Sequence, residues 1–430
     1  MRALRSLLVT TVSASALLGG APGAAHAECG ATHWVGSWFA PPSDTTSLVD
    51  PYLSPTLAVG DQTYRIVITP HRGGGSVRVH LTNRFRPLPL TIAHATVALR
   101  SDGAGVQPDS LRTLTFDGAQ DVTLAPGADI VSDPVDFPLT AWQPIVVGIN
   151  AAGIAPIPTE HFNADATSYY TPPDTGDHTA DPDGAAFGLS TTAALIASGV
   201  DVQAPADVAT VVAFGDSITD GYISGNVIGT PQNPEAIDTN ARYTDFLQRR
   251  FDDAGVPVSV LNSGISGNRV QAGGFIPEFG PSGLDRLDAD AISQAGVTDV
   301  IVAEGINDLG IPIAAGYDQL VAAYTTLITR LHAAGLRVHL GTLLPASNAL
   351  TDGILTMPAA DPVRIRVNDW IRTQQLSDSF IDFDAALRDP ANPSTMDRAY
   401  AGPDNLHPNP TGYRKMADTV DLSTFSGGHC

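Results

Sequence analysis

The first half of the sequence has the pattern of many short β-strands. Residues 63–68, 76–81 and 91–97 alternate between apolar and polar positions or are rich in β-branched side chains. A triple glycine at 73–75 and further prolines separate these runs, as expected for turns. No convincing helical period occurs in residues 30–205. Short strands at close spacing predict a β-sandwich or jelly-roll-like domain.

From about residue 209 the pattern changes to alternating strands and helices. Apolar runs of strand length occupy residues 211–214, 256–261, 300–303, 338–340 and 380–383. Segments of helical period lie between them, most clearly at 317–331, where the apolar side chains that share one face are Leu320, Tyr324, Leu327 and Leu331. This alternation predicts an α/β domain with a parallel sheet covered by helices on both faces.

The amino-terminal end has the pattern of an export signal. A basic start is followed by an apolar run at 7–18 and by small residues that end in Ala25-His26-Ala27. The run is shorter than the about 20 apolar residues that a membrane span needs. We therefore predict a signal peptide at 1–27, cleaved near Ala27, and a secreted protein without a transmembrane anchor. The remainder exceeds one ordinary compact core, so we predict two domains, at 28–205 and 206–430.

Charge and cysteine content narrow the possible partners. The formal net charge is −22, which repels nucleic acid and anionic lipid, so we expect no nucleic-acid partner. The two cysteines, Cys29 and Cys430, lie near opposite ends of the chain. In an exported protein such a pair suggests a disulfide, and two unpaired thiols remain the alternative.

Ser217 is the first candidate for chemistry. It follows the run at 211–214, and Gly215 allows a tight turn into a helix that would begin at Ser217. A helix N-terminus stabilises negative charge. The same Gly-Asp-Ser run is also ordinary turn and capping chemistry, and Asp216 is expected to cap or brace the turn.

Three more candidates follow at later strand ends. Gly267 can present a backbone N–H to a ligand, and Asn307 can present its side-chain amide, although each also fits an ordinary turn. Among the eleven histidines, His407 alone has a carboxylate, Asp404, three residues earlier. That spacing allows Asp404 to orient the ring while its other nitrogen faces Ser217, as in nucleophilic catalysis. A lone Asp-x-x-His is more often a loop hydrogen bond, so the order of all four segments carries the prediction.

These four segments resemble the blocks of the SGNH hydrolases, the GDSL-type esterase/lipase superfamily. The sequence has Ile218 where the name of that family has leucine. The resemblance implies a flavodoxin-like three-layer α/β/α domain with a triad of Ser217, His407 and Asp404. It also implies an oxyanion hole formed by the N–H groups of Ser217 and Gly267 and by the amide of Asn307, with no cofactor and no metal.

The resemblance continues outside the blocks. Four further stretches resemble the sequences of a large secreted bacterial branch of this family, whose members have an N-terminal β-rich domain. These stretches are residues 34–38, 77–83, 199–202 and 284–290. The resemblance implies a wide choice of ester substrates, since family members cleave acetyl groups from polysaccharides as well as aryl and lipid esters. An acidic, exported protein with a β-rich domain suits a small-molecule or polysaccharide-linked ester better than an anionic lipid surface. Asn268 and Arg269 are candidates for substrate contact, or Arg269 pairs with an acidic neighbour.

Two other functions remain open at this point. One is a lipase or acyltransferase on the same scaffold, and the other is a carbohydrate-binding protein with an inactive hydrolase domain. The sequence does not reveal the natural ester, the acyl-chain preference, the role of the N-terminal domain or the oligomeric state.

Overall fold

The computed structural model describes residues 32–45, 61–153, 158–223, 236–273, 279–310, 314–349 and 357–428. The predicted signal peptide at 1–27 lies outside the described residues. Cys29 and Cys430, the two cysteines of the predicted disulfide, also lie outside them. Export and the disulfide therefore stay predictions.

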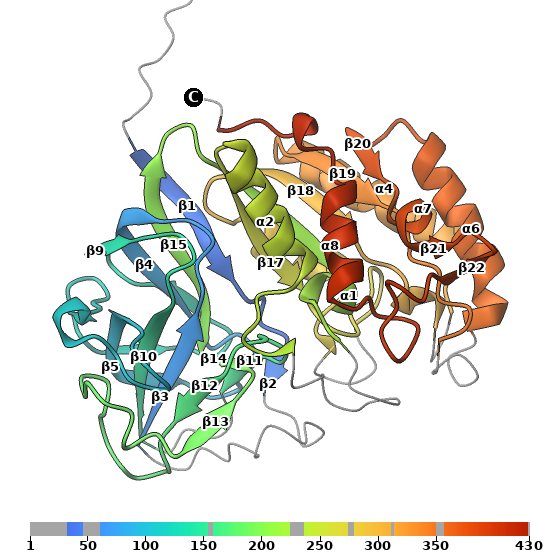
Figure 1. Cartoon of the computed structure of the whole chain (residues 1–430). Helices are drawn as coiled ribbons and strands as arrows, with labels where there is room; N and C mark the ends of the chain where they lie inside the picture. The colour runs from blue at the N-terminus through green and yellow to red at the C-terminus, as the bar shows by residue number, and fades with distance from the viewer. Residues whose placement is uncertain are drawn as a thin grey trace, which may run out of the picture.

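The N-terminal domain is a sandwich of antiparallel sheets (Figure 1). One sheet has the strand order β1 (Thr32–Phe39), β15 (Ala197–Pro205), β4 (Gly74–Thr82) and β8 (Asp129–Val131), and β9 (Val135–Leu139) also pairs with β4. The second has the order β13 (Leu189–Thr191), β12 (Ser168–Tyr170), β3 (Gln62–Ile68), β10 (Ile145–Ala152), β5 (Leu90–Leu99) and β6 (Arg112–Thr113), with β7 (Val122–Leu124) beside β5. A small third sheet contains β14 (Ala194–Leu195), β11 (Thr159–His161) and β2 (Asp44–Thr45).

The core of this domain lies between the two larger sheets. Val77 and Val79 of β4 belong to the same buried cluster as Ile66 of β3 and Val147 of β10. Along β4 the buried positions alternate with partly exposed ones, which is the pattern that predicted this strand. The β-rich prediction for the first half is confirmed.

The C-terminal domain contains one parallel sheet of five strands. Their order is β17 (Val258–Gly264), β16 (Ala209–Gly215), β18 (Val297–Ala303), β19 (Arg337–Gly341) and β20 (Ser379–Ile381). Numbered along the chain, this order is 2-1-3-4-5, the flavodoxin-like arrangement. The fold predicted for this half is therefore confirmed.

The helices of this domain form two contacting groups. One group is α2 (Tyr243–Ala254), α7 (Phe383–Leu387) and α8 (Pro410–Thr419), and the other is α3 (Gly283–Leu287), α4 (Tyr317–Ala333) and α6 (Met357–Thr373). In α4, the four side chains predicted to share one face are all fully buried. Figure 1 shows α2 and α8 side by side over the sheet. Right-handed crossovers place the two groups on opposite faces.

Two strand boundaries differ from the sequence prediction. The strand expected at 256–261 begins at Val258 and continues to Gly264. Asn262 and Ser263 are polar, yet they fit a buried strand because Asn262 Nδ2 donates to Thr219 O at 2.7 Å and Ser263 Oγ donates to Asp290 O at 2.9 Å. The strand expected at 380–383 ends at Ile381.

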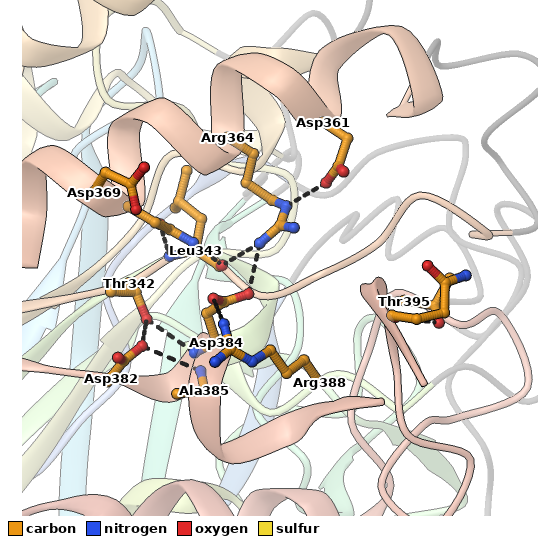
Figure 2. Close-up of polar contacts among 12 residues, drawn as sticks. Thr342, Leu343, Asp361, Arg364, Asp369, Asp382, Asp384, Ala385, Arg388 and Thr395 are labelled. Atoms are coloured by element: carbon orange, nitrogen blue, oxygen red, sulfur yellow. Dashed lines mark hydrogen bonds and ion pairs between the residues drawn. The ribbon is translucent and has the colours of Figure 1, made fainter. Parts of the chain in front are cut away.

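Charged side chains connect the segment that follows β19 to the helices α6 and α7 (Figure 2). Arg364 of α6 donates from Nε to Asp361 and from Nη1 to Asp384, each at 2.7 Å, and Nη1 also donates to Leu343 O at 3.2 Å. The Arg364 side chain is only 3% exposed, so these contacts compensate a buried charge. Arg364 thus ties Leu343, which follows β19, to α6 and to Asp384 of α7.

The two domains meet along β1 and β17. Gly36 of β1 donates its N–H to Ala295 O at 2.9 Å, and Ser259 Oγ of β17 donates to Gly36 O at 2.6 Å. Arg84 of the N-terminal domain also donates to Asp290 at 2.7 Å. The chain passes between the domains after β15, and β16 begins at Ala209. The interface is thus close-packed and contains buried polar contacts.

Candidate active site

Ser217 lies at the carboxyl end of a central strand. β16 ends at Gly215, and Ser217 is the first residue of the short helix α1 (Ser217–Asp220). Asp216 caps this helix, because its Oδ1 accepts from Ile218 N at 3.0 Å. Burial raises the pKa of Asp216 to about 7, although the Ile218 N–H opposes that shift. The predicted capping role of Asp216 is confirmed.

His407 faces Ser217 across the sheet edge. Its Nε2 lies 2.7 Å from Ser217 Oγ, and its Nδ1 lies 2.7 Å from Asp404 Oδ2. The ring of Tyr222 packs against the imidazole of His407 in an edge-to-face arrangement, with the ring centroids 4.7 Å apart. The structure thus brings Ser217, His407 and Asp404 into one hydrogen-bonded line.

Asp404 is held so that it stays charged. Its Oδ1 accepts the backbone N–H groups of Leu406 at 3.0 Å and His407 at 2.9 Å. Burial opposes ionisation, but the charge of His407 and these hydrogen bonds lower the pKa of Asp404 to about 2. An ionised Asp404 accepts the Nδ1–H of His407, which leaves Nε2 free to accept the proton of Ser217.

The candidate oxyanion donors lie at the same edge of the sheet. Gly215 of β16 is in register with Gly264 of β17 and with Ala303 of β18. The segments that follow these three positions contain Ser217, Gly267 and Asn307 respectively. Asn307 Nδ2 donates to Asn268 O at 2.9 Å, so the second and third segments are in direct contact.

Gly267 has a conformation that other residues rarely adopt. Its φ is +76°, and a Cβ at this position would overlap the ring of Phe279. Glycine therefore allows the left-handed backbone conformation at this position and leaves room for the ring of Phe279.

Comparison with known families bears on this geometry. The model of the GDSL-like lipase/acylhydrolase family matches residues 213–415, which include Ser217, Gly267, Asn307, Asp404 and His407. These residues form a GDSL-like lipase/acylhydrolase domain. No curated protein matches the sequence.

Several solved structures are similar to the GDSL-like domain or to more of the chain. A putative lipolytic protein of the G-D-S-L family from Desulfitobacterium hafniense DCB-2 is 16% identical, with a TM-score of 0.35 over 49% of this chain and 96% of that chain. An inhibitor-bound aryl esterase of M. smegmatis is also 16% identical, with a TM-score of 0.40 over 49% of this chain and 95% of that chain. A family two carbohydrate esterase from Clostridium thermocellum, in complex with cellohexaose, is 14% identical, with a TM-score of 0.36 over 90% of this chain and 96% of that chain.

Asn268 has a different place from the one expected for a substrate-binding residue. It is fully buried, and its Nδ2 donates to Phe279 O at 2.6 Å and to Pro281 O at 2.7 Å. Its Oδ1 accepts from Arg286 Nε at 2.8 Å. Asn268 therefore holds together the segments around the candidate site. Arg269 is 8% exposed and its charge acts on Asp308, which agrees with the alternative of an acidic partner.

Arg286 is a structural residue of the GDSL-like site that the sequence did not single out. Besides Asn268, its guanidinium donates to Ser263 O at 3.0 Å and to Gly215 O at 2.8 Å. It thereby connects the strand ends that precede Ser217 and Gly267. Its side chain is 1% exposed, so one buried cation fixes several loops of the site at once.

The described residues contain neither a cluster of three or more His, Cys, Asp or Glu side chains placed to hold a metal nor a helix that is both long and apolar enough for a membrane span.

Substitution of Asn307 by alanine is expected to lower kcat by about 10²–10³-fold, the usual cost of one oxyanion donor. The amide has two N–H groups, and the bond to Asn268 O uses one and orients the other. Steady-state kinetics on p-nitrophenyl acetate measure the effect. Asn392→Ala, at the exposed first residue of β22 (Asn392–Met396), is the control. An unchanged kcat in folded Asn307→Ala would remove Asn307 from the oxyanion hole.

Proposed function

We propose that this protein is a serine esterase that hydrolyses carboxylic esters through an acyl-enzyme. The observation that carries the proposal is the line of hydrogen bonds from Ser217 Oγ to His407 Nε2 and from His407 Nδ1 to Asp404, each 2.7 Å long. It lies at the carboxyl ends of parallel strands, where ligands of such sheets bind. The GDSL-like domain makes a hydrolase of the lipase/acylhydrolase type the function class.

The residues then have the following roles. Ser217 Oγ attacks the ester carbonyl carbon as its proton passes to His407 Nε2, and Asp404 stabilises the imidazolium. The negative oxygen of the tetrahedral intermediate accepts from the N–H groups of Ser217 and Gly267 and from Asn307. His407 gives its proton to the leaving alcohol. Water, deprotonated by His407, then attacks the acyl-enzyme, and the carboxylic acid leaves as Ser217 regains its proton.

We also propose that the enzyme is exported and that its substrates are soluble short-chain, aryl or carbohydrate-linked esters. The net charge of −22 supports this choice over an anionic lipid surface, because like charges repel over distances of about a Debye length.

Two measurements on the wild-type chain test the proposal. A fluorophosphonate, which reacts with activated serines, is expected to label one residue, and mass spectrometry of the digest is expected to place the label on Ser217. Hydrolysis of p-nitrophenyl esters from acetate to palmitate is expected to be fastest at the short end. Slow turnover of every ester by a folded protein that takes up no label would reject the esterase assignment.

A further inference from the structure

A contact between the two domains reaches α1, the helix that begins at Ser217. His161, the last residue of β11, places its Nε2 3.2 Å from Oδ1 of Asp220, the last residue of α1. The two side chains are 4% and 1% exposed. Asp220 lies on the same short helix as Ser217, so the N-terminal domain reaches the element that carries the nucleophile.

The other oxygen of this carboxylate holds the loop that contains Gly267. Oδ2 of Asp220 accepts from the backbone N–H of Ser266 at 3.0 Å and from its hydroxyl at 2.6 Å. Ser266 directly precedes Gly267, whose N–H is a proposed oxyanion donor. His161, Asp220 and Ser266 thus form a continuous chain of contacts from the N-terminal domain to the oxyanion hole.

The ring of His161 is itself fixed by the N-terminal domain. Its Nδ1 lies 2.8 Å from Pro41 O, and its Nε2 lies 3.2 Å from Asn163 O as well as close to Asp220. The ring therefore has contacts on both nitrogens and little freedom to rotate.

We propose that His161 is a positioning residue for ester hydrolysis, which acts through Asp220 and Ser266 on the N–H of Gly267. This inference rests on the esterase function proposed above. An oxyanion donor is used mainly in the transition state, so a loosened donor lowers kcat and leaves substrate binding nearly intact. The N-terminal domain then completes the catalytic site in addition to any role in binding.

The chain offers a matched control for this contact. His71 of the N-terminal domain places Nε2 2.9 Å from Asp245 Oδ1 in α2 and Nδ1 2.7 Å from Val260 O. These side chains are 9% and 7% exposed, so burial and chemistry resemble those of the His161 pair. Neither Asp245 nor Val260 belongs to the loops that carry Ser217, Gly267 or Asn307.

The test compares His161→Ala, His161→Gln and His71→Ala in the full chain with p-nitrophenyl acetate. For His161→Ala we expect kcat about 10- to 100-fold lower, with KM within about threefold of wild type. For His161→Gln we expect partial recovery of kcat, because its amide can donate to Asp220. For His71→Ala we expect a wild-type kcat, even where Tm falls.

A second variant keeps the test informative if His161→Ala does not fold. Ser266→Ala leaves the interdomain contact in place and is also expected to lower kcat. In the double variant His161→Gln/Ser266→Ala, the loss is expected to be smaller than the product of the two single losses, because both changes act on one chain of contacts. Equal kcat values for His161→Ala and His71→Ala, or a change in KM alone, would overturn the inference while wild-type hydrolysis upholds the esterase. An inactive wild type would instead reject the esterase and this inference with it.

Discussion

Substitution of Ser217 by alanine is expected to lower kcat for p-nitrophenyl esters by about 10⁶-fold, the loss typical for removal of a serine nucleophile. Without Oγ there is no group 2.7 Å from His407 Nε2 to form the acyl-enzyme. The remaining oxyanion donors give only slow, direct attack by water. The amount of p-nitrophenol released after a long incubation measures this residual rate.

The structure indicates that Ser217→Ala will fold normally. The N-cap of α1 is Asp216, and the backbone of Gly215 is held by Arg286, so neither support uses the Ser217 side chain. Thermal unfolding of the variant and of Ser293→Ala, a change at an exposed serine, provides the control. A loss of activity smaller than about tenfold in the folded variant would place the nucleophile elsewhere.

Substitution of Asp404 by asparagine is expected to lower kcat by about 10⁴-fold. The asparagine Oδ1 can still accept the N–H groups of Leu406 and His407, so the loop is preserved. Its amide then donates to His407 Nδ1 and forces the proton onto Nε2, where it faces Ser217. In that tautomer the ring cannot accept the serine proton.

The acid stability of the wild type and of Asp404→Asn tests the contribution of the Asp404 carboxylate. The pKa of Asp404 is lowered from its ordinary value of 3.8 to about 2, so this group adds stability above about pH 4 that is lost as the pH falls toward 2. We therefore expect the acid unfolding of Asp404→Asn to depend less on pH between 4 and 2 than that of the wild type. Asp397→Asn, which alters a carboxylate that accepts from the Ala399 N–H at 2.9 Å, is the control. Equal kcat values for Asp404→Asn and this control would contradict the orienting role.

The residues of the candidate site that the sequence could locate are those with a local signature. Ser217 follows an apolar strand and a Gly-Asp pair, and Asp404 is three residues from His407, so these positions stand out without knowledge of the fold. The 2-1-3-4-5 order then brings the strand ends together. The sequence makes Asn268 a candidate for substrate contact, but its side-chain amide donates to the carbonyls of Phe279 and Pro281 instead.

Residues that act through distant partners had no such signature. His161 lies 59 positions before Asp220, in a β-rich segment where a histidine carries no motif. Arg286 lies in a stretch that resembles other proteins, but nothing in the local sequence shows that it joins two strand ends. Such contacts depend on how the helices and strands pack together. The spacing of apolar residues along the sequence predicts these elements but not their packing. For a related reason the sequence pattern ends the second strand of the hydrolase domain at residue 261, before the observed end of β17 at Gly264. The buried polar side chains at its end look like loop residues.

The packing of β1 on the sheet of the hydrolase domain has a consequence for dissecting the protein. Gly36 lies so close to Leu261 that a Cβ at position 36 would overlap the leucine side chain. A hydrolase domain expressed without residues 28–205 would expose Leu261 to water, at a cost of about 1.5–3 kcal/mol for that side chain alone. It would also leave the buried Asp220 and Asp245 without their histidines. The isolated hydrolase domain is therefore expected to be less stable than the full chain, and the two domains should be expressed and studied together.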